Sequence, residues 1–189
     1  MRSNCKRFLT AVLNELTAWQ EHTRLKSIRL IMLLVVLCEE HLTIDTYTII
    51  PLLLKAYYTT IQETPLTMHQ APISTSHHTP SFLHHTPSSI HHTPSELVYG
   101  FLTVFELMGR FIHPDTYVYY LVCRLTNEGD GVANPYTDHT YTLCVAHMLV
   151  MMVYGSKGGG GGGLAPHLDV LVKALTDLRV LPLDSGVLG

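Results

Sequence analysis

Residues 24–61, RLKSIRLIMLLVVLCEEHLTIDTYTIIPLLLKAYYTTI, decide the fold of this chain. Residues 30–38 are apolar almost all round, which predicts a helix that is covered on more than one side. The second half carries apolar side chains at helical spacing, at Tyr47, Ile50, Leu54, Tyr57 and Ile61. Between them, the polar residues 39–41 end the first pattern, and Thr43 or Asp45 is a candidate cap for the next helix. This pattern predicts a helix hairpin that needs neighbouring helices to bury its apolar surface.

Further helices are predicted on both sides of this stretch. An amphipathic helix is expected over residues 6–21, with an apolar stripe at Leu9, Val12, Leu16 and Trp19. A second hairpin is expected to begin at a capping box formed by Thr93 and Glu96, and Pro114 starts its partner helix. A third hairpin is expected over residues 137–178, with Pro166 at the start of its second helix. The apolar stripes expected in these hairpins are Leu97, Phe101, Phe105 and Met108; Val118, Leu121, Val122 and Leu125; Tyr141, Val145, Met148 and Met152; and Leu168, Leu171, Leu175 and Leu178.

Three hairpins and one extra N-terminal helix predict an all-α protein, specifically an α-solenoid of HEAT or armadillo type. The repeat of about 40 residues, once an insertion is removed, fits these units better than the about 34 residues of tetratricopeptide repeats. The expected organisation is a first part at 1–61, an insertion at 62–94, the second and third hairpins at 95–180, and a tail at 181–189.

The insertion contains a repeated His-His-Thr-Pro-Ser unit that begins at residues 77, 84 and 91. A proline in every unit opposes a helix, so the segment is expected to be disordered or extended. Its six histidines can bind metal adventitiously, but no dedicated metal site is expected because a flexible tract does not fix ring orientation. A small metal-binding protein is therefore a lesser alternative, tested by deletion of residues 77–92.

The glycine run at 158–163 contains the spacing of a phosphate-binding loop. No predicted strand precedes the run, and no Lys-Ser or Lys-Thr follows it. We therefore expect a flexible linker between the two helices of the third hairpin.

Composition narrows the class of protein. A hydrophobic content of 47% with 14% charged residues excludes a wholly disordered chain, and a net charge of −3 gives no reason to expect nucleic acid as a partner. The longest apolar windows, 30–38 and 141–155, are shorter than the about 20 residues of a membrane helix, and the first residues lack a signal-peptide layout. Four scattered cysteines favour free thiols in a reducing compartment, so a cytoplasmic location is expected.

No catalytic, cofactor-binding or metal-binding residue is predicted, because the sequence lacks the motifs of hydrolases, metalloproteases and nucleotide-binding enzymes. A non-enzymatic protein without a small-molecule substrate is the prediction. Candidate partner-binding residues are two adjacent tyrosine pairs at comparable places in their hairpins, Tyr57 with Tyr58 and Tyr119 with Tyr120. One ring of each pair is expected to face the core and the other a protein partner; the alternative is that both pack between repeats.

Three stretches of the chain resemble the HEAT-repeat axonemal dynein assembly factors. They are residues 24–43, the string ELMGRFIHPDTY at 106–117, and LAPHL at 164–168 with LTD at 175–177. The resemblance implies a cytoplasmic scaffold that helps to preassemble dynein arms, with dynein chains and chaperones as partners and no active-site residue. The alternative is a general HEAT-type adaptor of the transport-receptor or phosphatase-scaffold kind.

Overall fold

The computed structural model describes residues 2–18, 20–63, 96–126, 139–157 and 163–177. Every regular element within these ranges is helical, which confirms the all-α prediction for this part of the chain. In chain order the elements are α1 (Arg2–Glu15), α2 (Glu21–Cys38), the 3-10 helix η1 (Glu39–Asp45), α3 (Thr46–Glu63), α4 (Glu96–Phe111), α5 (Pro114–Thr126), α6 (His139–Ser156), the 3-10 helix η2 (Ala165–His167) and α7 (Leu168–Thr176).

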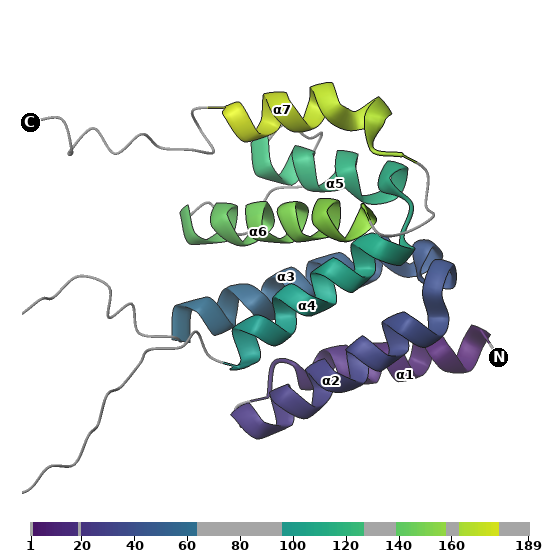
Figure 1. The fold of residues 1–189 in the computed structure, drawn as a ribbon. Coiled ribbons are helices and arrows are strands. Elements are labelled where there is room, and N and C mark those ends of the chain that lie inside the picture. The colour runs from purple at the N-terminus through teal and green to yellow at the C-terminus, as the bar shows by residue number, and fades with distance from the viewer. Residues whose placement is uncertain (1, 19, 64–95, 127–138, 158–162, 178–189) are drawn as a thin grey trace, which may run out of the picture.

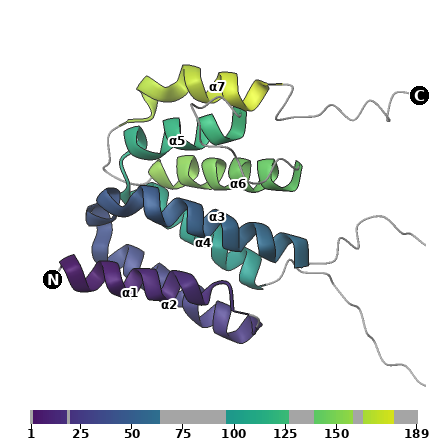
Figure 2. The same ribbon diagram turned by 180° about the vertical axis from the view of Figure 1, so that it is seen from behind.

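The helices are stacked in layers (Figure 1). The first layer holds α1 and α2, and the next holds α3 and α4; α6 packs on this second layer, and α5 lies between α6 and α7. Helices α2, α4 and α6 follow one another along one side, and the view from behind shows α1 and α3 on the other (Figure 2). The most extensive helix contacts are those of α4 with α6 and with α2, so α4 is the centre of the stack.

The packing partners differ from the expected hairpins. The sequence pairs residues 24–38 with 46–61, but α2 packs mainly on α1 and α4, whereas α3 packs mainly on α6, α4 and α1. Likewise, α4 packs on α2 and α6 rather than on its successor α5. The reason is that η1 carries the chain from one layer to the next. Helices α1 and α4 cover only part of the apolar stretch 30–38, in which Ile31 and Val35 are buried. Its other apolar side chains Leu33, Val36 and Leu37 are 60%, 44% and 78% exposed, so the stretch is covered less completely than expected.

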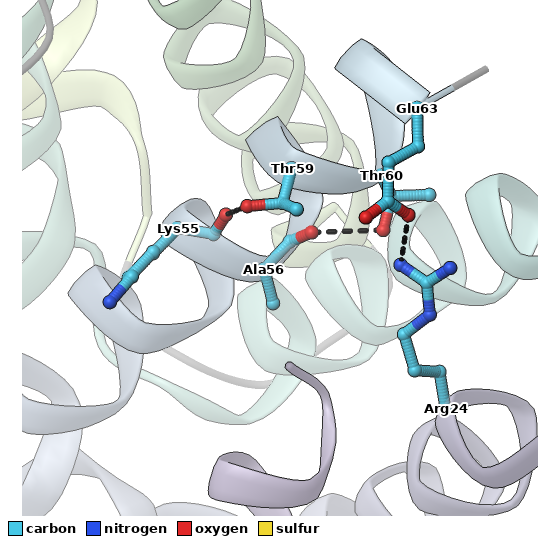
Figure 3. A network of polar contacts seen from close by, with 6 residues as sticks. All are labelled: Arg24, Lys55, Ala56, Thr59, Thr60 and Glu63. Atoms are coloured by element: carbon cyan, nitrogen blue, oxygen red, sulfur yellow. Dashed lines mark hydrogen bonds and ion pairs between the residues drawn. The ribbon is translucent and has the colours of Figure 1, made fainter. Parts of the chain in front are cut away.

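An ion pair joins the start of α2 to the end of α3: Arg24, in the first turn of α2, extends toward Glu63, the last residue of α3 (Figure 3). Arg24 Nη1 lies 2.6 Å from Glu63 Oε2. Beside them, the hydroxyls of Thr59 and Thr60 donate to the carbonyl oxygens of Lys55 and Ala56, at 3.0 and 2.9 Å. Both carbonyl groups lie inside α3, more than one turn before its end at Glu63, so each hydroxyl shares an acceptor of the helix instead of capping its C-terminus.

Buried apolar side chains form one core that runs through all the layers. Its centre is aromatic: the Tyr57 ring of α3 lies 5.4 Å from that of Phe101 and 5.3 Å from that of Phe105, both on α4. Tyr117 of α5 is also fully buried. Two residues expected on buried stripes are instead exposed, Tyr47 at 58% and Leu168 at 54%. Both stand in the first turn of their helices, where neighbouring helices no longer cover them.

Several expected boundaries move. The first helix ends at Glu15 rather than residue 21, and the chain starts a new helix at Glu21. Helix α3 continues through Gln62 and Glu63, two residues inside the expected insertion, because no proline lies between Ile61 and Pro65.

The rest of the expected insertion, the glycines at 158–162 and the tail at 181–189 lie outside the described residues. Thr93 of the expected capping box and Trp19 of the first stripe also lie outside them. Of the helices that are described, none has the combination of length and apolar composition that a membrane crossing requires.

Candidate partner-binding surface

The two predicted tyrosine pairs differ in their surroundings. Tyr57 and Tyr58 are both buried, at 1% and 7% exposure, so this pair does not present the outward ring that was expected. In the second pair, Tyr119 is 72% exposed while Tyr120 is half-buried. The reason is position: α3 lies between α1, α4 and α6, whereas one side of α5 has no helix against it within the described part of the chain.

Tyr57 links two helices inside the core. Its hydroxyl lies 3.0 Å from Nδ1 of His147 on α6, and its ring packs on the aromatic centre of α4. Burial raises the pKa of the Tyr57 phenol, and the neighbouring Cys144 adds to this effect. Burial lowers the pKa of the His147 imidazole. Tyr57 therefore stays a neutral hydrogen-bonding group at ordinary pH, and its place is that of a core residue.

A second group of aromatic rings reaches from the interior to the surface. We call Tyr47, Tyr58, Tyr120, Arg124 and Tyr141 the tyrosine–arginine cluster. The Tyr47 and Tyr120 rings meet edge to face, with their centroids 5.4 Å apart. The Tyr58 and Tyr141 rings meet in the same way at 5.8 Å. The cluster thus joins α3, α5 and α6.

Arg124 connects the two ring pairs. Its guanidinium carbon lies 4.6 Å from the centroid of the Tyr120 ring, which is one turn earlier on α5. Its Nη1 donates to the Tyr141 hydroxyl at 3.2 Å. Burial raises the pKa of Tyr120, and the positive charge of Arg124 opposes that rise. The planar guanidinium is therefore held by a stacking contact on one side and a hydrogen bond on another.

The solvent exposure of the side chains increases from the inner to the outer members of the cluster. Tyr141 and Tyr58 are buried, Tyr120 and Arg124 are half-buried, and Tyr47 is 58% exposed. Tyr119 stands beside Tyr120 in the chain and is more exposed still. We call Tyr47, Tyr120 and Arg124, together with the adjacent exposed Tyr119 of α5, the α3–α5 surface. Tyr47 is held against Tyr120, and Arg124 links Tyr120 to the inner ring of Tyr141.

The prediction from sequence did not include Tyr47 and Arg124 as members of this surface, or Tyr141 as part of the cluster beneath it. Tyr47 was assigned to the core, and the other two stand on helices whose approach is set by packing. One local signal was available: Tyr120 and Arg124 are four residues apart, a spacing at which an aromatic ring and a guanidinium meet on a helix.

A separate polar group lies at the start of α5. Asp115 Oδ1 is 2.6 Å from His167 Nε2, and Asp115 Oδ2 is 3.3 Å from His113 Nδ1. These contacts tie η2 to α5. Among the residues that the structure describes, no set of three or more histidine, cysteine or acidic side chains is arranged to hold a metal ion.

Comparison of the chain with protein-family models, with curated proteins and with solved structures gives no match in any of the three. The similarity of residues 24–43, 106–117 and 164–177 to dynein assembly factors therefore stays a prediction from sequence.

Proposed function

We propose that this protein is a non-enzymatic α-solenoid scaffold of HEAT or armadillo type, which binds a protein partner on the α3–α5 surface. The solenoid assignment is supported by the layers of helices, in which each layer packs on the next through α2, α4 and α6. In such an architecture a continuous core is built from neighbouring units, and one row of helices is left to face partners.

The observation that carries the binding proposal is the combination of exposed and anchored aromatic rings. Tyr119 and Tyr47 are 72% and 58% exposed, and the Tyr47 ring packs on Tyr120, against which Arg124 is stacked. Tyrosine and arginine are enriched among the residues that dominate binding energy at protein interfaces. A ring that is already held in place loses little conformational entropy when a partner covers it.

As the biological setting, we propose cytoplasmic preassembly of axonemal dynein arms, with dynein chains and chaperones as partners. The support for this setting is the similarity of residues 24–43, 106–117 and 164–177 to the assembly factors. The second candidate is a general HEAT-type adaptor. The few charged side chains on α3 and α5 favour the first, since transport receptors tend to present acidic inner surfaces.

The test is a pull-down from the cytosol of ciliated cells with the full chain, tagged, as wild type and as Tyr47→Ser/Tyr119→Ser. Recovery of dynein chains with chaperones by the wild type, and its loss in the double variant, is the expected result. Tyr99→Ser is the matched control, because Tyr99 is 55% exposed but stands on α4.

Each of the other possible outcomes would contradict one part of the proposal. Capture of a transport or phosphatase complex would retain the scaffold and remove the dynein setting. Equal capture by wild type and double variant would remove the α3–α5 surface as the binding site. No specific capture by folded wild-type protein would contradict the scaffold function itself.

A further inference from the structure

The Arg124 guanidinium is a half-buried charge without a carboxylate partner in the described part of the chain. It contacts Tyr120 and Tyr141, and its Nε is buried without a hydrogen-bond partner. Arg24 also has a buried Nε without a hydrogen-bond partner, but its side chain, which is 11% exposed, is paired with the carboxylate of Glu63. Placing a cation partly out of water is unfavourable unless an anion or further hydrogen bonds compensate it.

The acidic residues of the three helices that carry the tyrosine–arginine cluster are engaged elsewhere. Helices α3 and α5 carry one acid each, and α6 carries none. The acid of α3 is Glu63, which pairs with Arg24, and the acid of α5 is Asp115, which contacts His113 and His167. Within the described residues, α3, α5 and α6 therefore offer no free carboxylate to Arg124, which lies among tyrosine rings.

We propose that Arg124 binds a side-chain carboxylate from an acidic peptide segment of the partner protein, while Tyr47 and Tyr120 pack against the atoms that flank it. A guanidinium presents its donors in a planar fork that fits a carboxylate. Tyr120 and Tyr141 already orient that plane, so little freedom is lost on binding. This inference rests on the proposed function and names the chemistry of the partner.

A carboxylate fits this site better than a phosphorylated segment does. Recognition of a phosphate dianion in proteins uses clusters of arginines. Among the residues of α3, α5 and α6, the further lysine or arginine is Lys55, which is exposed on α3 and has no contact with the cluster. One guanidinium matches one carboxylate in charge.

The experiment measures fluorescence anisotropy of a labelled ten-residue Glu/Ala peptide as the full chain is added, at low and at physiological ionic strength. The same peptide with Gln in place of Glu is the control ligand. We expect binding of the Glu peptide that weakens with salt, and weaker binding of the Gln peptide. Arg124→Gln is expected to weaken binding of the Glu peptide by about tenfold or more.

Two variants make the test specific to this site. Arg110→Gln on α4 makes the same change of charge away from the cluster, and we expect it to bind the Glu peptide as wild type does. Arg124→Lys keeps the charge but removes the planar fork, and we expect intermediate affinity. Far-UV circular dichroism confirms that each variant is folded, and comparison of the two peptides on wild-type protein needs no variant.

The proposal is overturned if wild-type protein binds neither peptide, if it binds both equally, or if Arg124→Gln binds as tightly as wild type. A variant without the acidic residues of the segment 127–138, Glu128→Gln/Asp130→Asn/Asp138→Asn, tests for a carboxylate from the chain itself. The proposal is also overturned if this variant binds the Glu peptide and wild-type protein does not. Failure here and failure of the proposed function are distinct. If the pull-down depends on Tyr47 and Tyr119 but the Glu peptide does not bind, the proposed scaffold function is retained and only the carboxylate site is rejected.

Discussion

Gly109 of α4 and Gly155 of α6 pack reciprocally where these two helices cross. A Cβ atom at Gly109 would lie 1.9 Å from the carbonyl oxygen of Met152, one turn before Gly155. A Cβ atom at Gly155 would lie 1.9 Å from the carbonyl oxygen of Glu106, one turn before Gly109. Because both obstacles are backbone atoms, the central contact of the stack is open to glycine alone at these two positions.

We predict that Gly109→Ala and Gly155→Ala each lower the free energy of unfolding by about 2–3 kcal/mol, as overpacked core substitutions do. The sign of this change distinguishes a hindered position from a free one, because alanine in an unhindered helix position is about 1 kcal/mol more favourable than glycine. Urea unfolding followed by circular dichroism at constant m value measures the change.

Gly163→Ala is the matched control for both variants. Its nearest neighbouring atom lies 3.9 Å from the added Cβ, so we expect a change within about 0.5 kcal/mol. Gly100→Ala should fall between the two cases, because its Cβ meets a side-chain atom, Cγ2 of Ile28, at 2.6 Å. If Gly109→Ala and Gly163→Ala unfolded at the same urea concentration, the close crossing of α4 and α6 would be contradicted.

Two tyrosines of α5 are predicted to differ sharply in their effect on stability. Tyr117 is fully buried and its hydroxyl donates to the Met152 carbonyl oxygen at 3.3 Å, so Tyr117→Ala should cost about 3–5 kcal/mol. Tyr119 is 72% exposed, and Tyr119→Ala should change stability by about 0.5 kcal/mol or less. Thermal unfolding of both variants measures these two changes in stability. A large loss for Tyr119→Ala would place its ring in the core and remove it from the α3–α5 surface.

Local periodicity predicted the buried faces of the central helices well. The stripe Leu97, Phe101, Phe105 and Met108 is buried throughout, as is the stripe Tyr141, Val145, Met148 and Met152. A face of one helix is a local property, because residues three and four apart lie on the same side. The helix class and the faces of α4 and α6 were therefore accessible from sequence.

Packing partners were not accessible in the same way. An apolar stripe states that a helix is covered but not by which neighbour, and the order of the chain suggested α2 with α3 when α4 covers α2. The α3–α5 surface was not predicted for the same reason, since it depends on which helices pack together. Tyr47 lies on the expected stripe but stands beyond the covering helices, and Arg124 reaches Tyr141 because α5 packs on α6.

The Arg24–Glu63 ion pair predicts an asymmetric response to mutation. The Arg24 side chain is 11% exposed and that of Glu63 is 53% exposed. Glu63→Gln leaves a largely buried cation without its charged partner, and we expect a loss of about 1 kcal/mol or more. A double-mutant cycle with Arg24→Met, measured by urea unfolding, isolates the pair. Additive effects of the two substitutions would contradict a coupling between α2 and the end of α3.

The last prediction concerns the dependence of stability on pH. Burial lowers the pKa of His147 in the folded chain below its ordinary value of 6.5. As pH falls below about 6.5, the unfolded chain takes up a proton at this histidine that the folded chain does not, so folding becomes less favourable. Above that pH the term vanishes, because His147 is neutral in both states.

We predict that the difference in free energy of unfolding, wild type minus His147→Gln, falls as pH is lowered from about 7.5 to about 5.5. The glutamine keeps a polar group near the Tyr57 hydroxyl but does not titrate. Comparison of two proteins is needed because the chain has 13 histidines, and the other 12 cancel in the difference. Tyr57→Phe is the matched control: it removes the hydroxyl 3.0 Å from Nδ1 and leaves the imidazole, so its pH dependence should follow that of wild type. Parallel curves for wild type and His147→Gln would show that solvent reaches this imidazole freely and that the contact between α3 and α6 is looser than described.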